Sequence, residues 1–367
     1  MIRLSYPEIG EEEIQAVVEV LRSGFLVQGT HVAEFEQRAA TYLGVRNAVA
    51  VSSGTAALHL ALLALGIGPG DEVIVPDFTF PATANVVEMV GARAVLVDID
   101  LTTFNVNVEV IRQAITINTR TIIPVHLFGL SADMEPILDI AKKHSLLVIE
   151  DAACALGAVY NGRKCGSLGD LGCFSFHPRK AITTGEGGLV VTDNVELAER
   201  LRQLRNHGMQ LVDGSYHIEH AGLNYRMTDF QGALGTVQFD RLEGIIRRRA
   251  ELARLYTQAL VNAPGITCPR EIAGSRHVWQ SYVVLLDEIF PRNRFIQKMR
   301  ERGIETTIGT YAVSAQDYYR PRGLNLPCSL QAYRQSLSLP LHTRMAEQDV
   351  ETVVNNLLDL THLLAGA

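Results

Sequence analysis

The sequence predicts an α/β protein, with a three-layer, mostly parallel sheet in a large domain and a smaller α+β domain at the C-terminus. Over residues 48–150, short apolar runs alternate with helical segments, which is typical of parallel strands buried on both faces. The pattern changes after residue 191, where longer helices precede a stretch rich in Pro and Gly and then a new strand.

The length of the chain also favours two domains. Its 367 residues exceed one typical core. We expect a large domain over residues 1–245 and a small one over 246–367, with the N-terminal segment packing on the small domain.

The individual elements follow from local signals taken in chain order. Two amphipathic helices open the chain, and Gly24 and Gly44 follow them, as glycine commonly does at the end of a helix. Alternating strands and helices come next. We expect helices at residues 11–22, 32–42, 56–65, 82–90, 108–114, 134–144, 195–206 and 229–259, and strands at 48–51, 73–75, 94–97, 121–125, 146–150, 173–176, 189–191 and 278–286.

Composition and charge exclude several classes of protein. Apolar residues make up 47% of the chain and charged residues 20%, which is enough for a sizeable core and excludes a disordered protein. The net charge of -7 gives no support for nucleic-acid binding. Runs of like charge are short, and we expect Glu11–Glu13 and Arg247–Arg249 to form exposed helix faces.

The sequence shows neither the pattern of a membrane span or signal peptide nor a cysteine motif. No apolar stretch reaches the length of a membrane span, and the start, MIRLSYPEIG, lacks the layout of a signal peptide. We therefore expect a cytoplasmic protein without a membrane partner. The five cysteines are an odd number without a CxxC pair, so we expect neither a disulfide framework nor a metal site.

Ligands in such sheets bind beyond the carboxyl ends of the strands, so the residues there are the candidate site. After the strand at 48–51, the run SSGT, which contains Gly54 and Thr55, leaves amide groups and hydroxyls free for a phosphate. A plain helix cap explains the same residues. After the strand at 73–75, Phe80 can either lie on a flat ring or pack in the core.

Asp151 and Lys180 carry the chemistry of the candidate site. Asp151 follows the mainly apolar strand at 146–150, where a carboxylate is costly to bury without a cation; a metal ligand or a capping aspartate is the alternative. Lys180 lies on a tight connection between two core strands, and the glycines after it let the backbone come close to a ligand. An ordinary solvated lysine is the alternative here.

Together, these residues are the parts that a pyridoxal 5'-phosphate (PLP) site requires. Such a site needs a phosphate cradle, a lysine to capture the aldehyde, a carboxylate for the pyridinium nitrogen and an aromatic ring for stacking. The carboxylate keeps the ring nitrogen protonated, because an opposite charge nearby favours the charged form. The combination therefore predicts PLP as the cofactor.

Six runs in the chain resemble the DegT-type family of PLP-dependent sugar aminotransferases, which have the fold type I architecture. The resemblance covers nearly the whole chain, and the linked motifs are specific for the family. The runs are SSGTAALHLALLALGIGPGDEVIVPDFTFPATAN, PVHLFG, VIEDAACALGA, GSLGDLGCFSFHPRKAITTGEGGLVVTDN, LNYRMTDFQGALGTVQ and SLSLPLHTRM.

The resemblance implies a role for each candidate residue. Lys180 is expected to form the Schiff base and to shuttle the proton, and Asp151 to pair with the pyridine nitrogen. Phe80 is expected to stack on the ring. The phosphate-binding residues implied are Gly54, Thr55 and Ser175.

Two further positions come from the family pattern. An asparagine that matches Asn224 reaches the phosphate of the neighbouring subunit, which implies a homodimer with shared active sites. Cys154 stands beside the cofactor where relatives usually carry His or Gln, and Ala181 replaces an asparagine that often follows the lysine. These departures leave the core chemistry in place.

The resemblance also implies the reaction. Family members commonly transfer the amino group of L-glutamate to a keto group of a nucleotide-linked deoxysugar. The loop ITTGEGG after the lysine favours a 4-keto-6-deoxy sugar over a 3-keto sugar. A cyclitol aminotransferase of the same family and a non-catalytic PLP-binding regulator are the alternatives, although a regulator tolerates the loss of Lys180 or Asp151 and both are present.

Overall fold

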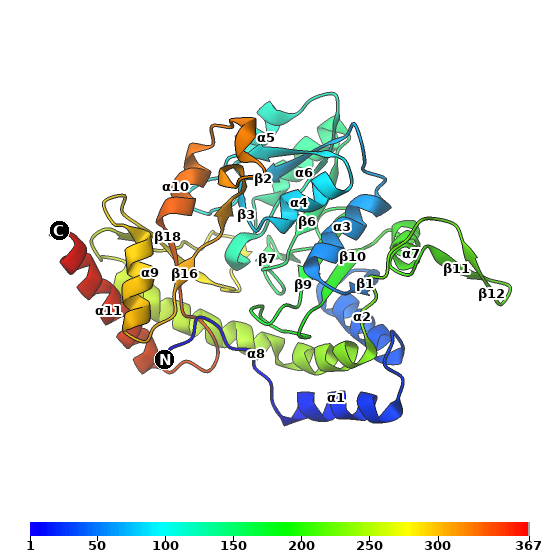
Figure 1. The fold of residues 1–367 in the computed structure, drawn as a ribbon, viewed down its shortest axis with the longest axis horizontal. Coiled ribbons are helices and arrows are strands. Elements are labelled where there is room, and N and C mark those ends of the chain that lie inside the picture. The colour runs from blue at the N-terminus through cyan, green and yellow to red at the C-terminus, as the bar shows by residue number, and fades with distance from the viewer. Residues whose placement is uncertain (366–367) are drawn as a thin grey trace.

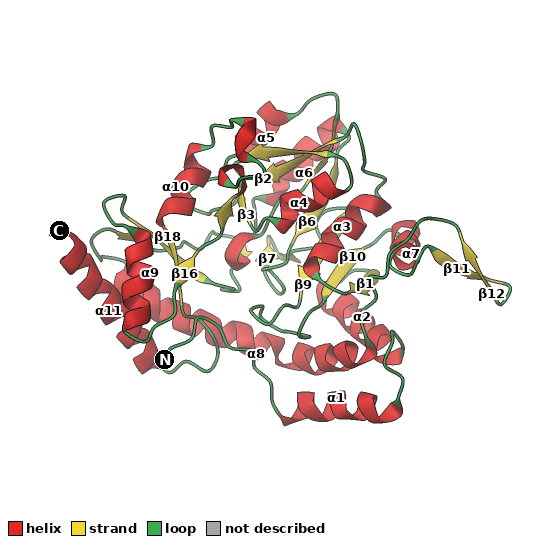
Figure 2. Cartoon of the chain, in the orientation of Figure 1, coloured by secondary structure: helices red, strands yellow, loops and turns green. Residues whose placement is uncertain are grey.

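The computed structural model describes residues 1–365, and its centre is a seven-stranded sheet (Figures 1 and 2). All strands of this sheet run in one direction except β10, which is antiparallel to both of its neighbours. The sheet is therefore mostly parallel, as predicted. Its strands in spatial order are β1 (Asn47–Val51), β10 (Gly188–Thr192), β9 (Leu171–Ser175), β6 (Leu147–Asp151), β5 (Thr119–Ile122), β2 (Glu72–Pro76) and β4 (Arg93–Val97).

Helices cover both faces of the sheet, because alternate residues of each strand point to opposite sides. The helices are α2 (Thr30–Leu43), α3 (Gly54–Ala64), α4 (Ala82–Met89), α5 (Val108–Ala114), α6 (Met134–His144), α7 (Val195–Leu204) and α8 (Asp229–Leu260). Val49 and Val51 pack with α3 and α4 on one side, while Ala48 and Ala50 pack with α2 and α8 on the other. α5 and α6 cover that second side over Ile74. The predicted three-layer fold is confirmed.

A second, smaller sheet lies in the C-terminal part of the described chain. Helix α8 runs unbroken across residue 245 and packs its C-terminal half on this sheet. The division into two domains near that residue stays a prediction. The strands in spatial order are β13 (Ile266–Thr267), β15 (Tyr282–Leu286), β18 (Ser336–Leu339) and β16 (Thr307–Ile308), and the helices are α9 (Arg292–Glu301), α10 (Pro327–Gln335) and α11 (Glu347–Ala365).

The N-terminal segment lies against this second sheet. Ile2 forms a bridge with Ile304, and the Leu4 carbonyl accepts a hydrogen bond of 3.1 Å from the Leu341 amide. Helix α1 (Glu11–Ser23) then runs beside α8 (Figure 1).

Several short strands complete the fold. A hairpin projects from the body of the molecule (Figure 1), and other pairs connect distant segments. They are the hairpin β11 (Met209–Val212) and β12 (Ser215–Ile218), the pair β3 (Phe78–Thr79) and β17 (Tyr311–Ala312), and the group β14 (Ser275–Arg276), β7 (Val159–Tyr160) and β8 (Arg163–Lys164).

Two predictions about charged runs are partly wrong. Glu13 of the first run is fully buried and forms an ion pair of 3.0 Å with Arg241. Arg249 of the second run is only 3% exposed.

The strand expected from residue 278 begins at Tyr282, because the backbone at Trp279 has a φ of 51° and cannot continue an extended strand.

The remaining global features concern membranes, thiols and metals. Among residues 1–365, no helix combines the length and the apolar character needed to cross a membrane. All five cysteines are free thiols. Within the same described range, His, Cys, Asp and Glu side chains do not gather in a group that could bind a metal ion.

Candidate active site

A cavity of about 500 Å³ lies at the carboxyl ends of the central strands. It brings together residues that are far apart in the sequence, and it also contacts the second sheet through Ser338 and Leu339. Asn224 does not belong to its wall. The predicted site residues that line it are Gly54, Thr55, Phe80, Asp151, Cys154, Ser175 and Lys180.

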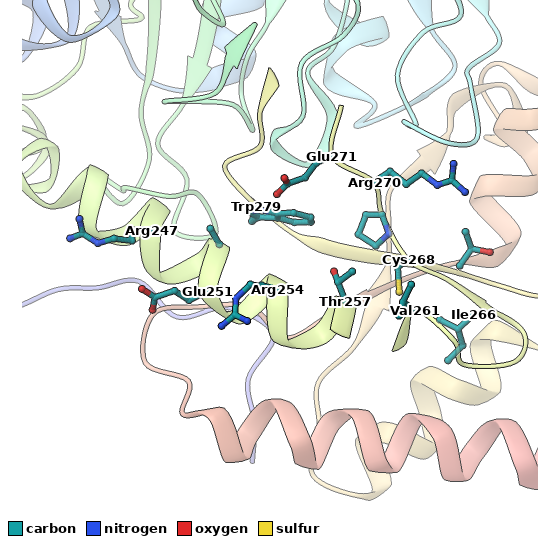
Figure 3. A pocket seen from close by; sticks show the side chains of 13 residues that line it. Arg247, Glu251, Arg254, Thr257, Val261, Ile266, Cys268, Arg270, Glu271 and Trp279 are labelled. Carbon is teal, nitrogen blue, oxygen red and sulfur yellow. The ribbon is translucent and has the colours of Figure 1, made fainter. Parts of the chain in front are cut away.

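A larger hollow, of about 910 Å³, lies elsewhere, along the outer side of α8 and beside β13 (Figure 3). Arg247, Arg254, Arg270 and the edge of Trp279 line it. None of the predicted site residues reaches this hollow, and its wall has no lysine to capture an aldehyde. The smaller cavity therefore holds the candidate site.

The turn before α3 has the geometry of a phosphate cradle. Ser53 caps the helix, since its Oγ accepts a hydrogen bond of 3.0 Å from the Ala56 amide. Gly54 and Thr55 open the helix, so their amide groups have no acceptor within it. A Cβ on Gly54 would lie 2.7 Å from the Ser175 Cβ, so this position has room only for glycine.

The neighbouring strand closes this cradle. Gly188 of β10 pairs with Val51 on one side and with Ser175 on the other. A Cβ on Gly188 would lie 2.2 Å from the Ser53 carbonyl oxygen. The two glycines thus let the helix start and the Ser175 hydroxyl approach one small volume, which suits a phosphate at a helix N-terminus.

Asp151 ends strand β6 at the floor of the cavity and is 5% exposed. Its Oδ2 accepts a hydrogen bond of 2.8 Å from the Thr83 hydroxyl, and its Oδ1 accepts one of 3.1 Å from the Ala153 amide. Burial raises the pKa of Asp151, and the two hydrogen bonds oppose that rise. Because neither donor is charged, the buried carboxylate fits a cationic group such as a protonated ring nitrogen.

Thr83 is a site residue that the sequence analysis missed. Its Oγ1 lies 3.1 Å from the Thr79 Oγ1 and 3.1 Å from the Phe80 carbonyl oxygen. A hydroxyl has one hydrogen, so Thr83 serves Asp151 best when Thr79 donates to it in turn. The signal was present, since Thr83 follows Phe80 by three positions, just after the helix begins at Ala82.

The backbone below Asp151 is held by a buried hydrogen-bond network around Glu150 and His126. Glu150 accepts hydrogen bonds of 2.7 Å from the amides of Gly166 and Gly169, and it lies 2.8 Å from His126 Nε2. His126 Nδ1 accepts from the Ala132 amide, which places the ring proton on Nε2, and the His126 amide donates to the Asp151 carbonyl. These contacts fix the end of β6, and the sequence pattern did not identify them.

Lys180 lies on the loop between β9 and β10 and points into the cavity. Its amide donates a hydrogen bond of 2.8 Å to the His177 carbonyl across the turn at Pro178. Its Nζ donates to Cys154 Sγ at 3.1 Å. Cys154 and Lys180 are both partly exposed, so a ligand in the cavity can reach them.

Phe80 lines the cavity, whereas Asn224 lies outside it. The Phe80 ring is 63% exposed and meets the Tyr311 ring edge-on, with 6.3 Å between the ring centres. This leaves ring surface open for stacking. Asn224 is exposed and bridges Asn206, next to Tyr225, whose carbonyl accepts a hydrogen bond of 2.9 Å from the Ser52 amide. The individual roles of all these residues stay predictions.

The residues present fit PLP. The space beside Gly54, which a Cβ would fill, suits the phosphate. The buried Asp151 carboxylate, which has no charged donor, suits the ring nitrogen, and the Lys180 amine lies in the same cavity.

The model of the DegT/DnrJ/EryC1/StrS aminotransferase family matches residues 7–358.

The chain belongs to this family. It is 40% identical over 373 residues to the spore coat polysaccharide biosynthesis protein SpsC of Bacillus subtilis, with 97% of this chain and 96% of SpsC covered. It is also 40% identical over 358 residues to GDP-perosamine synthase of Caulobacter vibrioides, with 96% of each covered.

A solved relative shares the whole fold. The PLP form of Spr1654 from Streptococcus pneumoniae superposes with a TM-score of 0.94 at 30% identity, and 98% of each chain is covered. The protein is therefore a sugar aminotransferase of the DegT type, and its cofactor is PLP. The predicted family, fold type and cofactor are confirmed.

Proposed function

We propose that the protein transfers the amino group of L-glutamate to the keto group of a nucleotide-linked 4-keto-6-deoxy sugar. The proposal rests on one observation: a single cavity contains the Lys180 amine, the buried Asp151 carboxylate and a turn suited to a phosphate. The name of the Caulobacter relative supports a nucleotide-linked sugar, because it names a GDP-linked product. The loop ITTGEGG supports the 4-keto choice.

Each site residue has its own role in the proposed transamination. PLP supplies an aldehyde for the amine and a ring that stabilises negative charge on the neighbouring carbon. Gly54, Thr55 and Ser175 hold the phosphate through amide and hydroxyl groups. Asp151 holds a proton on the ring nitrogen, because its carboxylate stabilises the cationic form there.

Lys180 moves the protons. Its Nζ takes the proton from Cα of glutamate in the first half of the reaction and delivers a proton to the sugar carbon in the second half. Two halves on one cofactor require that 2-oxoglutarate leaves before the sugar reacts. The exposed Phe80 ring would stack on the flat ring of the cofactor, and Cys154 Sγ lies 3.1 Å from the lysine amine.

We further propose a homodimer in which Asn224 serves the neighbouring active site. Three observations support it. Asn224 is exposed outside its own cavity, the hairpin of β11 and β12 projects from the body (Figure 1), and this hairpin carries exposed apolar side chains. Leu211 is 61% and Tyr216 68% exposed, which is unusual on a hairpin that solvent alone surrounds. A cytoplasmic location stays a prediction.

The test of the substrate is direct amination. The protein is incubated with PLP, L-glutamate and matched pairs of 4-keto-6-deoxy and 3-keto nucleotide sugars, and mass spectrometry follows the aminated product. The proposal predicts product from the 4-keto sugar only, and none from a Lys180→Ala control. Amination of the 3-keto sugar alone, or with glutamine as the only effective donor, would overturn it.

The shared site has a separate test. The variants Lys180→Ala and Asn224→Ala are purified separately and then mixed under conditions that exchange subunits. If the sites are shared between subunits, the mixture regains activity that neither variant has alone. A monomer by sedimentation, or a mixture as inactive as its parts, contradicts the dimer proposal.

A further inference from the structure

Arg249 is a buried arginine directly behind the loop that carries Lys180. It belongs to α8 and is 3% exposed. Its Nη2 donates a hydrogen bond of 3.3 Å to the Lys180 carbonyl, and its Nη1 donates to the Gln280 side chain at 3.2 Å. The guanidinium therefore joins the main chain of the reactive lysine to the segment that precedes β15.

Gln280 holds the adjacent peptide. Its Nε2 donates to the Arg179 carbonyl, while its Oε1 and its own carbonyl accept from Arg249. Trp279, just before Gln280, has a φ of 51°, and the Gln280 carbonyl accepts a hydrogen bond of 3.4 Å from Arg249 of α8. The carbonyls of Arg179 and Lys180 thus accept hydrogen bonds from Gln280 and Arg249, respectively. We term this pair of side chains the Arg249–Gln280 clamp.

Arg249 forms no ion pair within residues 1–365, although Glu8 and the Cys154 thiol partly oppose the effect of burial on its pKa. No carboxylate of residues 1–365 lies within ion-pair distance of it, and its Nε has no hydrogen-bond partner in the same part of the chain. Burial lowers the pKa of Arg249 to about 10. An unpaired buried cation destabilises a fold, so packing alone does not explain why this position carries arginine.

Arg205 provides a comparison within the same molecule. It is also buried, at 4% exposure, but it forms an ion pair of 2.5 Å with Glu36 and donates to the Ala50 carbonyl at 2.6 Å. Arg205 is a paired, structural arginine. Arg249 differs because its hydrogen bonds go to the lysine loop and to Gln280 and none goes to an acid.

We propose that Arg249 is a positioning residue, which with Gln280 fixes the backbone of the Lys180 loop so that the lysine amine stays aimed into the cavity. The proposal rests on the role proposed above for Lys180. A displacement of about 1 Å in a reacting group is enough to lower a rate by about 100-fold. The clamp therefore acts on the rate and on cofactor capture, and its unpaired charge lowers the stability of the fold.

The test compares Arg249→Met with Arg205→Met, and uses Arg247→Met as an exposed control on the same helix. For Arg249→Met we expect the cofactor-free protein to keep or raise its Tm, because a buried unpaired charge is removed. We expect kcat and the rate of PLP capture to fall about 10- to 100-fold, with little change in KM for the sugar. For Arg205→Met we expect a lower Tm, because Glu36, whose side chain is only 14% exposed, loses its cation and keeps only the hydrogen bond from the Ala50 amide.

A chemical readout on the cofactor-free protein tests position independently of turnover. Acetic anhydride labels lysines, and peptide mass spectrometry compares Lys180 with Lys164 as an internal reference. We expect the relative labelling of Lys180 to change in Arg249→Met and not in Arg247→Met. In a double-mutant cycle with Gln280→Leu, we expect the two losses to be clearly non-additive, because both residues act through one clamp.

Arg249→Lys tests the geometry of the clamp. A single ammonium group cannot reach both the Lys180 carbonyl and Gln280 in the way that a guanidinium does, so we expect rescue to be partial. Capture and kcat of Arg249→Met within twofold of the parent would overturn the proposal, as would a fall in Tm that matches the Arg205 variant and accounts for the losses. If Lys180→Ala still captures PLP and turns over normally, the role of Lys180 fails instead.

Discussion

Replacing Asp151 by asparagine isolates the charge at the floor of the cavity. The two side chains have the same shape, and the asparagine Oδ1 can still accept from the Ala153 amide. The Thr83 hydroxyl can rotate to accept from the new amide and can still donate to the Phe80 carbonyl, 3.1 Å away. We therefore expect Asp151→Asn to fold normally and to lose only the negative charge.

The size of the effect follows from the bond that is lost. A hydrogen bond to a charged group contributes about 1.5–3 kcal/mol, which corresponds to about 10- to 150-fold in affinity. We expect the Kd for PLP to rise within this range. We expect kcat to fall at least as much, because the ring nitrogen is no longer held in its protonated form.

Asp151→Asn should weaken PLP binding and turnover, but it should not lower the stability of the cofactor-free protein. Burial raises the folded-state pKa of Asp151 above its ordinary value. The contribution of this group to stability is therefore fully present below the ordinary pKa of aspartate and is lost as the pH rises through the raised value. Asparagine does not titrate, so the variant should be at least as stable as the parent at neutral pH.

Three measurements decide the matter: thermal unfolding of the cofactor-free and PLP-loaded forms, titration with PLP, and steady-state turnover. The reasoning is refuted if kcat and the Kd for PLP stay within twofold of the parent. It is also refuted if the cofactor-free variant is less stable than the parent at neutral pH, since the buried charge would then be a stabilising one.

Three further predictions concern Lys180, the cysteines and Asp77. Lys180→Ala should bind PLP weakly without a bond that borohydride can fix, and it should show no transamination; full turnover would end the assignment. Iodoacetamide should label Cys154 of the cofactor-free protein faster than Cys165 or Cys173, because burial raises the pKa of Cys165 to about 12 and that of Cys173 well above its ordinary value. Bound PLP should slow the labelling of Cys154, and faster labelling of either buried thiol contradicts the prediction. Burial raises the pKa of Asp77 to about 6 from 3.8, so this group should lower the unfolding free energy of the parent by about 3 kcal/mol as the pH rises between these values. In urea titrations at different pH, Asp77→Asn should lose about 3 kcal/mol less than the parent over this range; an equal loss in both contradicts the prediction.

Local pattern was sufficient to predict most of the central fold. Apolar runs and glycine caps predicted the elements of the large sheet, and the residues at strand ends predicted part of the cavity wall, including Asp151 and Phe80. The direction of β10 could not be predicted this way, because a strand buried on both faces looks the same in either direction. The pairings of β3 with β17 and of β7 with β14 were also missed, since strands of two residues leave little pattern.

The buried arginine could have been found from helix geometry. Residues 247 and 249 are two positions apart, which places them on opposite sides of a helix. Arg249 also follows Ile245 and Ile246 and precedes Leu252 and Ala253 at the spacing of one apolar face, and all of these residues are buried. Reading the three arginines as a single charged run hid this periodicity.

Other parts of the site depend on long-range contacts that no local pattern contains. The Thr83 hydroxyl reaches Asp151 across 68 positions, and the Gln280 side chain reaches the Arg179 carbonyl across 101. Strand ends and the resemblance to the family together predicted the site residues that line the cavity. They did not predict the side chains that hold those residues in place.

The central claim is that Lys180 and PLP carry out transamination with L-glutamate, and the visible absorption spectrum tests it most directly. The purified protein with PLP should show the yellow band of a lysine-bound cofactor. Addition of L-glutamate should bleach this band and release 2-oxoglutarate in an amount equal to the sites. A band that glutamate leaves unchanged would contradict the proposed donor, and absence of any band after PLP is added would contradict the role of Lys180.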